Sequence, residues 1–411
     1  MKILFFQHAV GRGGATVSLR YLVSGLVERG HDVHVALNAG GRELAEIYTG
    51  VGAECHVVST IPSFLHTTAA HVSPLAPRTL LATAKMITRL PAAGRSLQQL
   101  VKVLSPDVIH LNSATLGPTA LALRSCGVPL VWHVREAPPF RSRGLRTKVL
   151  AGLMKRLAAE TVFISQDDRR TWSGNRFGTV IYNCAAIKQL PDKAELAVLR
   201  ESLGLDAGSR VVLFMGGLQK IKGIAQLCAG IPTIVARMPE ARFVILGADP
   251  SPPSSHLAAV ARRLASAVGL PPFHLRMLRL LASPSLAPYV RVLPSVDGVS
   301  NYLAMCDVLV FPAVSPHFAR PVIEAALAGK PVVASKLGGV EEVVENNKTG
   351  LLVPAGAVAE LVDAVLDLLG DEEKASRISA ALQETAGDTF SISRHIDAVE
   401  AVYRRVVADV A

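Results

Sequence analysis

Short apolar runs alternate with helix-length segments along the first half of the chain. Each run is short and many are rich in β-branched residues, which is typical of buried β-strands. Strands that alternate with helices indicate βαβ units around a parallel sheet. The strands expected in this half are 2–8, 32–37, 55–60, 107–112, 129–134, 161–165 and 179–183.

The second half repeats this pattern. A strand at 210–216 leads through a glycine turn into a helix expected from about 224 to 237. Ligands of open parallel sheets bind beyond the carboxyl ends of the strands, so we expect the chemistry in the loops that follow them. Further strands are expected at 242–246, 290–293, 308–311, 332–335 and 351–353.

The two series of strands predict an α/β chain with two Rossmann-like domains that face each other across a cleft. The segment 184–193 lacks periodicity and contains Pro191, as a linker does. We therefore expect one domain at 1–190 and a second at 191–390. The last helix, within 391–411, is a candidate to pack back on the first domain.

Composition narrows the class of protein. Half of the 411 residues are hydrophobic and 18% are charged, which excludes a mainly disordered chain. No apolar run reaches the ~18–20 residues of a membrane span, and the opening run ends too early for a signal peptide. The five cysteines are widely spaced, without a CxxC pair or a histidine–cysteine cluster. We therefore expect a cytoplasmic protein with free thiols and no metal site.

The charge points to an anionic partner. Forty-three Lys and Arg against 33 Asp and Glu give a formal net charge of +10, which suits a nucleotide sugar, a membrane surface or nucleic acid. Aromatic residues make up only 5% and are not interleaved with basic ones in the way that is typical of surfaces that stack bases. We therefore expect no nucleic-acid partner.

Glycine turns follow the first strand of each half. Gly13 and Gly14 precede a helix, where backbone N–H groups and the helix dipole favour a phosphate, although a tight turn without a ligand explains them equally well. Gly216 and Gly217 repeat the arrangement, and Lys222 adds a cation that can pair with a diphosphate. The alternative for Lys222 is a solvated loop lysine.

The most informative segment runs from 311 to 335. A strand ends in a loop, a helix opens near Ala319, and Glu324 lies inside this otherwise apolar helix. A carboxylate there needs a partner, and ribose hydroxyls would supply one. The alternative is a glutamate on the one solvated face of the helix.

Together these pieces resemble the family-4 retaining glycosyltransferases of the GT-B fold, over nearly the whole chain. Each piece alone is weak, but their order and spacing are specific. The matching pieces are Gly13-Gly14, Gly30-His31-Asp32-Val33, Gly216 with Lys222-Gly223, Glu324 through Val333, Gly338-Gly339 with Glu342, and Thr349 through Val353.

The resemblance implies a role for each half of the chain. The first domain would bind the acceptor and the second the nucleotide-sugar donor. His133, Lys222 and Glu324 would be catalytic, with His133 beside the reacting sugar, Lys222 on the diphosphate and Glu324 on the ribose. A hydrogen-bonded histidine at a strand end is the alternative for His133. The implied donor-binding residues are Gly13, Gly14, Gly216, Gly217, Lys222, Phe318, Ala319, Arg320 and Glu324.

Two positions depart from the family pattern. Gly217 stands where the family usually has arginine, and Pro316 where it has a carboxylate. Arg320 or Lys220 could restore the positive charge, but Pro316 cannot replace a carboxylate. We expect Gly217→Arg to tighten diphosphate binding if the pocket keeps the shape of the family.

The implied reaction transfers a sugar from a nucleoside diphosphate to an acceptor hydroxyl with retention, and without a metal or other cofactor.

Two stretches, 75–104 and 141–156, are basic and free of acidic residues. Such stretches favour peripheral contact with the inner face of the plasma membrane, and therefore a lipid-linked or cell-surface glycan as the acceptor. A solvated helix face is the alternative. The competing functions are a catalytically silent GT-B assembly partner and, less favoured, a sugar-nucleotide epimerase.

Overall fold

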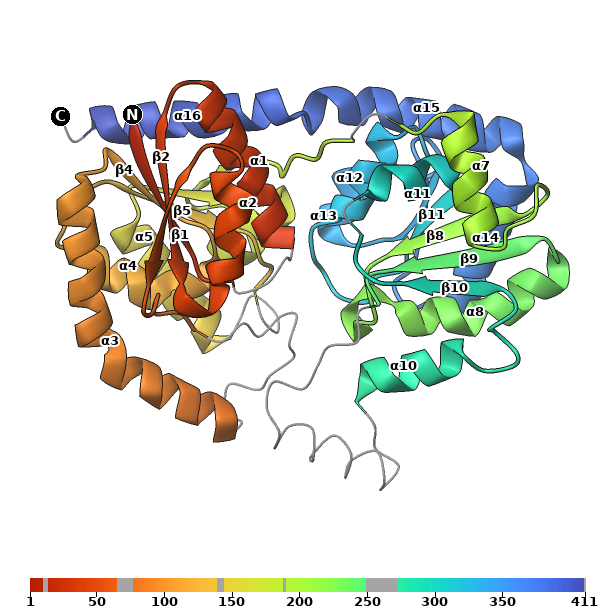
Figure 1. Ribbon diagram of the computed structural model, residues 1–411, viewed down its shortest axis with the longest axis horizontal. Coiled ribbons are helices and arrows are strands. Elements are labelled where there is room, and N and C mark those ends of the chain that lie inside the picture. Colours follow the sequence, from red (N-terminus) through yellow and green to blue (C-terminus); the bar gives the residue numbers. More distant parts are fainter. Residues whose placement is uncertain are drawn as a thin grey trace. The chain divides into compact units, whose positions relative to one another are not determined.

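The chain folds into two compact units in a computed structural model (Figure 1). The first unit comprises Met1–Ala185 and Thr389–Ala411, and the second comprises Ala186–Asp388. The structure describes residues 1–9, 14–64, 77–138, 144–187, 190–248, 272–296 and 298–409.

A seven-stranded parallel sheet forms the centre of the first unit, in the order β3-β2-β1-β4-β5-β6-β7. The strands are β1 (Lys2–Gln7), β2 (Asp32–Asn38), β3 (Glu54–Val58), β4 (Val108–Leu111), β5 (Leu130–Val134), β6 (Glu160–Phe163) and β7 (Thr179–Val180). The helices are α1 (Gly14–Glu28), η1 (Ala39–Leu44), α2 (Ala45–Thr49), α3 (Pro77–Leu104), η2 (Ala114–Leu116), α4 (Gly117–Leu123), α5 (Leu145–Leu157), α6 (Gln166–Ser173) and α16 (Ile392–Ala408).

Both faces of this sheet are covered, because successive residues of a strand point to opposite sides. Ile3 and Phe5 face a cluster that includes residues of α1 and α16, whereas Leu4 and Phe6 face one that includes residues of α3, α4 and α5. These four side chains have no exposed surface. A sheet buried on both sides explains why its strands read as continuous apolar runs.

The C-terminal helix α16 belongs to the core of the first unit. It buries five apolar side chains there, Ile396, Val399, Val402, Tyr403 and Val406. Contact with α1 is close, because a Cβ added at Gly25 would lie 1.7 Å from the Cδ1 atom of Ile396.

The second unit contains a six-stranded parallel sheet in the order β10-β9-β8-β11-β12-β13. Its strands are β8 (Arg210–Met215), β9 (Ala241–Leu246), β10 (Val290–Leu293), β11 (Val308–Phe311), β12 (Val332–Ser335) and β13 (Leu351–Val353). Its helices are α7 (Lys193–Ser202), η3 (Lys220–Lys222), α8 (Ile224–Arg237), α10 (Phe273–Leu281), α11 (Val299–Met305), α12 (Arg320–Leu327), α13 (Gly338–Glu341), α14 (Val358–Gly370) and α15 (Glu372–Thr389).

The predicted fold class is confirmed. Each expected apolar run contains a strand of one of the two parallel sheets, and the helix expected from about 224 to 237 is α8. The strand expected at 179–183 is shorter than predicted, because only Thr179 and Val180 pair with β6. No helix among the described residues is both long and apolar enough to cross a membrane.

Candidate functional site

The order of strands reverses at one place in each sheet. In the first unit β1 lies between β2 and β4, and in the second unit β8 lies between β9 and β11. At such a switch point the loops from neighbouring strands diverge and leave room for a ligand. The loops after β1, β8 and β11 are therefore the expected ligand-binding loops.

The loop after β1 carries the first predicted glycines. Gly13 lies outside the described residues, and Gly14 is the first residue of α1. A Cβ added at Gly14 would meet no atom within 4 Å, so the described structure leaves space at this helix start.

The turn after β8 depends on its glycines. Gly223 has a φ of +80°, and a Cβ there would lie 1.7 Å from the carbonyl oxygen of Pro312. The turn after β8 therefore packs against the end of β11, which only glycine permits. A Cβ at Gly216 would lie 2.8 Å from the ring of Phe214 and 3.1 Å from the Cβ atom of Lys222.

Gly217 cannot simply regain an arginine, which corrects the expectation for Gly217→Arg. Its φ is +62°, a left-handed conformation that side chains other than glycine rarely adopt. A Cβ there would also lie 2.6 Å from the carbonyl oxygen of Gly247. We therefore expect Gly217→Arg to strain the turn instead of tightening diphosphate binding.

Lys222 ends η3 and is half-buried. Its Nζ atom lies 5.9 Å from the centroid of the Phe311 ring, at the end of β11. Burial and the nearby charge of Arg320 lower the pKa of Lys222 to about 8. Burial and a like charge both disfavour the ammonium form of this lysine, so an anionic ligand would stabilise that form strongly.

Arg320 and Glu324 form an ion pair one turn apart on α12, with 3.0 Å between Arg320 Nε and Glu324 Oε1. Glu324 is only 2% exposed, and this burial raises its pKa against the opposing effect of Arg320. The remaining atoms Glu324 Oε2 and Arg320 Nη1 are buried and have no hydrogen-bond partner among the described residues. The pair therefore offers one unused acceptor and one unused donor.

His317, which the sequence analysis missed, lies in the loop between β11 and α12. Its Nδ1 atom donates to the carbonyl oxygen of Ser315 at 2.8 Å, and its ring contacts Phe311. Burial and Lys222 lower its pKa to about 3, so the ring is neutral. Nε2 is then an acceptor, and it has no partner among the described residues. A histidine two residues before an expected helix was the available signal.

The start of α12 is the place of the other predicted donor contacts. Ala319 is the N-cap residue and is buried, whereas Phe318 and Arg320 are half-buried. A Cβ at Gly339 in α13 would lie 3.8 Å from Cα of Phe318, so the predicted Gly338-Gly339 piece borders the same loop. Pro316 is exposed in this loop.

His133 lies inside β5 with no exposed surface. Its ring stacks on His395 of α16 at 6.1 Å between centroids, and its Nδ1 atom is 3.4 Å from Arg135 Nη2. Burial and Arg135 hold its pKa well below the usual range. The Nε2 atom of His133 is buried and has no hydrogen-bond partner among the described residues, so the role of His133 beside the reacting sugar stays a prediction.

Arg135, directly after β5, is the charged group that the sequence analysis missed. Its Nε and Nη1 atoms donate at 2.5 Å to the side-chain oxygens of Asn112 and Asn183. It is only 9% exposed, and burial lowers its pKa to about 10. Asn112 in turn donates to Gln7 at the end of β1, so a polar network joins the carboxyl ends of β1, β4 and β5. A charge directly after a buried strand was the available signal.

Two family models match successive parts of the chain. The first is described as a glycosyl transferase 4-like domain and matches residues 13–190. The second, glycosyl transferases group 1, matches residues 209–371. Together they cover most of the chain, and the second includes the Lys222–Glu324 site.

The chain is similar to several named glycosyltransferases. It is 31% identical to a D-inositol 3-phosphate glycosyltransferase of Mycolicibacterium vanbaalenii, over 51% of this chain and 44% of that protein. It is 24% identical to the Thermobispora bispora protein of the same name, over 73% and 72%. An alpha-maltose-1-phosphate synthase of Mycolicibacterium smegmatis is 28% identical over 53% and 52%. The match spans about half the length of most of these relatives.

Solved structures share the fold over the full length. Anabaena Alr3699/HepE, solved in complex with UDP and glucose, superposes with a TM-score of 0.76 at 22% identity, over 98% of this chain and 100% of that one. Sucrose-phosphate synthase from Thermosynechococcus elongatus gives 0.69 at 18% identity, over 99% of both chains. The two matched domains, the named relatives and this shared fold together place the chain in the family-4 glycosyltransferases of the GT-B fold.

Proposed function

We propose that the protein transfers a sugar from a nucleoside-diphosphate sugar to an acceptor hydroxyl, with retention at the anomeric carbon. One observation carries the proposal. On α12, beside Lys222, an ion pair buries one acceptor, Glu324 Oε2, and one donor, Arg320 Nη1, neither of which has a partner among the described residues. Buried polar atoms in native proteins normally have partners, so a ligand that supplies both is expected.

A nucleotide sugar has the complementary groups. Its ribose hydroxyls can donate to Glu324 Oε2, and its diphosphate oxygens can accept from Arg320 and Lys222. The loop after β8 presents Lys222, and the loop after β11 leads into the helix with Glu324, so both flank the switch point of the second sheet. A uridine nucleotide is the first candidate, since Alr3699/HepE was solved with UDP-glucose.

The chemistry follows from these groups. The bond between the anomeric carbon and the departing phosphate oxygen breaks, and the acceptor oxygen bonds to the same face of the sugar. The acceptor proton passes to the departing diphosphate, so no protein base is required. Lys222 and Arg320 would stabilise the charge that develops on the diphosphate, which is the usual large contribution of a preorganised site.

For the acceptor, we propose a lipid-linked or cell-surface glycan reached from an anionic membrane. Helix α3 supports this, because it exposes apolar and basic side chains together. Leu80, Leu81 and Ile87 are each more than half exposed, and Lys85 and Arg89 are exposed beside them. Arg141 and Arg143 of the second basic stretch lie outside the described residues.

A catalytically silent relative is the second candidate. Gly217 and Pro316 remove two charged groups of the family pattern, and Arg320 is already engaged by Glu324. The site could then bind a nucleotide without turning it over, as an assembly partner.

The deciding experiment incubates the protein with uridine, guanosine, adenosine and thymidine diphosphate sugars, with and without polyprenyl-linked and glycolipid acceptors. Acceptor-dependent release of nucleoside diphosphate supports the transferase, and the anomeric configuration of the product tests retention. Binding of a nucleotide sugar without release across the panel would favour the silent partner. Binding of none would remove the donor site.

A further inference from the structure

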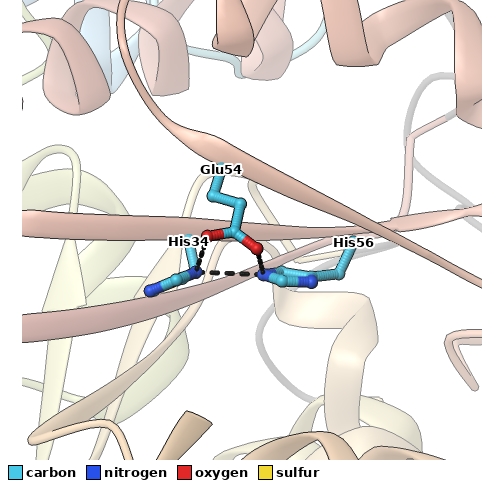
Figure 2. A group of neighbouring side chains, drawn as sticks. All are labelled: His34, Glu54 and His56. Atoms are coloured by element: carbon cyan, nitrogen blue, oxygen red, sulfur yellow. Dashed lines mark hydrogen bonds and ion pairs between the residues drawn. The ribbon is translucent and has the colours of Figure 1, made fainter.

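Three side chains with metal-ligating atoms meet at the edge of the first sheet. His34 comes from β2, and Glu54 and His56 come from the edge strand β3 (Figure 2). In the parallel pairing His34 lies opposite Glu54, and His56 lies two residues further along. Residues two apart on a strand point to the same face, so all three share one face of the sheet.

Their ligating atoms converge. His34 Nδ1 is 3.0 Å from His56 Nε2. The two oxygens of Glu54 lie 3.6 Å from His34 Nδ1 and 3.6 Å from His56 Nε2. Figure 2 shows the carboxylate and the two imidazoles directed at one common point.

These separations agree with those of a zinc site. Nitrogen and oxygen ligands about 2.0–2.2 Å from a tetrahedral zinc lie roughly 3.3 Å from one another. Imidazole with carboxylate is a ligand set that suits zinc and not the oxygen-preferring magnesium. We propose that His34, Glu54 and His56 bind a zinc ion that clasps the edge strand β3 to β2.

A second contact, independent of the three ligands, supports the site. His34 Nε2 lies 3.1 Å from Asp32 Oδ1, on the side of the ring away from His56, but the two atoms do not form a hydrogen bond and Nε2 has no hydrogen-bond partner among the described residues. A metal-bound histidine almost always donates its other N–H to a carboxylate or carbonyl, which fixes the tautomer and leaves the ligating nitrogen free of its proton. Asp32 is the carboxylate near enough to accept from Nε2 when a metal holds the His34 ring in place.

The exposure of the ligands and their position along the strands indicate how an ion would reach the site and how the site relates to the donor loops. His34 is 4% exposed, whereas the Glu54 side chain is 66% exposed, so an ion can enter from solvent beside a buried ligand. The ligands lie at the amino-terminal half of β2 and β3, and the loops of the candidate donor site follow carboxyl ends. The site is therefore separate from the proposed transfer reaction. The two histidines are 22 residues apart, a spacing that no metal motif predicts.

The experiment titrates the chelator-treated full chain, without a histidine tag, with zinc chloride by calorimetry, and repeats the titration with magnesium chloride. We expect one zinc ion per chain, no magnesium binding, and a higher Tm for the zinc-bound protein, because a ligand of the native state alone stabilises it. His56→Ala and Glu54→Gln should each weaken zinc binding at least tenfold. Asp32→Asn should weaken it by about 10–100-fold, as for other residues that orient a ligand.

Cys55→Ser is the matched control. Cys55 lies between the two β3 ligands but points to the opposite face, where its Sγ atom contacts the carbonyl oxygen of Ala45 at 3.6 Å. This variant should bind zinc as the wild type does. Absence of zinc binding in the wild type, or unchanged affinity in His56→Ala, would overturn the site and leave an ordinary hydrogen bond between two imidazoles.

Discussion

Glu324 combines two features that rarely occur together: its carboxylate is almost fully buried, yet one of its oxygens has no partner among the described residues. Burial raises its pKa, and Arg320 counteracts this. Keeping a buried charge half-satisfied costs stability, and such costs are common where a ligand completes the site. This makes the residue the sharpest test of the donor site.

We expect Glu324→Gln to weaken binding of the nucleoside by about 10–30-fold, or ~1.5–2 kcal/mol, the usual value of a hydrogen bond to a charged group. The amide keeps the size of the side chain and a carbonyl oxygen for Arg320, so the fold should remain. Calorimetric titration measures the change, with the exposed Glu360→Gln as control. If a folded Glu324→Gln binds the nucleoside like the wild type, the carboxylate is structural.

Lys222 should act on the diphosphate and not on the nucleoside. Lys222→Met keeps an unbranched aliphatic side chain and removes the charge, so it should weaken binding of the nucleoside diphosphate at least tenfold and leave binding of the nucleoside within about threefold. Lys220→Met, an exposed lysine two residues earlier, is the matched control. Equal loss for both ligands would show that Lys222 does not bind phosphate.

The pH dependence has a definite sign. The pKa of Lys222 is lowered to about 8, so its positive charge is present below that pH and is lost above it. Diphosphate affinity of the wild type should therefore fall as the pH rises through 8, and Lys222→Met should lack this dependence. The free energy of unfolding should instead increase as the pH rises above 8, because there the unfolded chain holds a proton that the native lysine has released. A diphosphate affinity that stays constant from pH 7 to 9 would contradict the assignment.

At the level of elements, α3 presents the least expected surface. It is covered on one side by the core of the first unit, yet exposes Leu80, Leu81 and Ile87 on another. Single exposed apolar residues are ordinary, but several beside exposed basic residues on one helix are typical of interfacial helices. Its composition predicted this mixture, and the structure adds which side chains are exposed.

We expect the protein to co-sediment with anionic vesicles and to do so less as salt rises. Lys85→Gln combined with Arg89→Gln should weaken this binding by ~2 kcal/mol, about 30-fold, because each basic residue near such a surface contributes roughly 1 kcal/mol. Lys193→Gln combined with Lys348→Gln, at two exposed lysines of the second unit, provides an equal change of charge elsewhere. If both double variants lose vesicle binding equally, binding depends on net charge and not on α3. Equal sedimentation with neutral vesicles would contradict an electrostatic surface.

For the whole molecule, the sequence was sufficient where structure is local. Strands buried on both faces read as apolar runs, and the glycine turn and the helix that hold Lys222 and Glu324 were predicted from the sequence, whereas the roles of these two residues stay predictions. The sequence was insufficient where a residue contacts residues that are distant in the chain. The burial of His133 depends on His395 of α16, and the conformation of Gly217 depends on Gly247. No local pattern contains such contacts.

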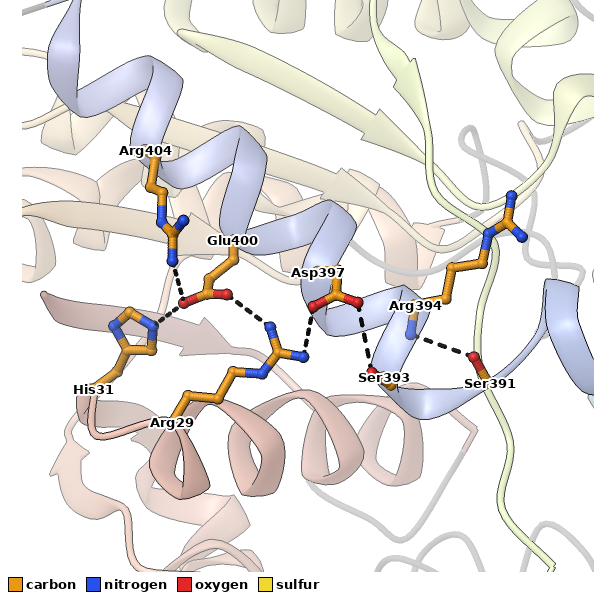
Figure 3. A network of polar contacts seen from close by, with 8 residues as sticks. All are labelled: Arg29, His31, Ser391, Ser393, Arg394, Asp397, Glu400 and Arg404. Carbon is orange, nitrogen blue, oxygen red and sulfur yellow. Dashed lines mark hydrogen bonds and ion pairs between the residues drawn. The ribbon is translucent and has the colours of Figure 1, made fainter.

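Helix α16 is another long-range contribution, and a polar network also ties it to the first unit (Figure 3). Glu400 pairs with Arg29 at 2.7 Å and with His31 at 2.7 Å, and Asp397 pairs with Arg29 at 2.6 Å. Hydrogen bonds from His31 and Arg29 hold the pKa of Glu400 at about 2, so its charge persists in mildly acidic solution. The helix therefore completes the first unit through both apolar and charged contacts.

We therefore expect a chain that ends at Asp388 to lose the first unit and keep the second. Five buried apolar side chains of α16 contribute about 7–15 kcal/mol at ~1.5–3 kcal/mol each, as much as the whole stability of a typical domain. The truncated chain should show only the thermal transition of the second unit, bind nucleoside diphosphate within about threefold of the full chain, and lose sugar transfer. A chain that ends at Asp409 keeps the described helix and should behave as the full chain does. If the chain ending at Asp388 retains both thermal transitions, the first unit folds without α16. If this chain no longer binds nucleoside diphosphate, the second unit alone does not hold the donor.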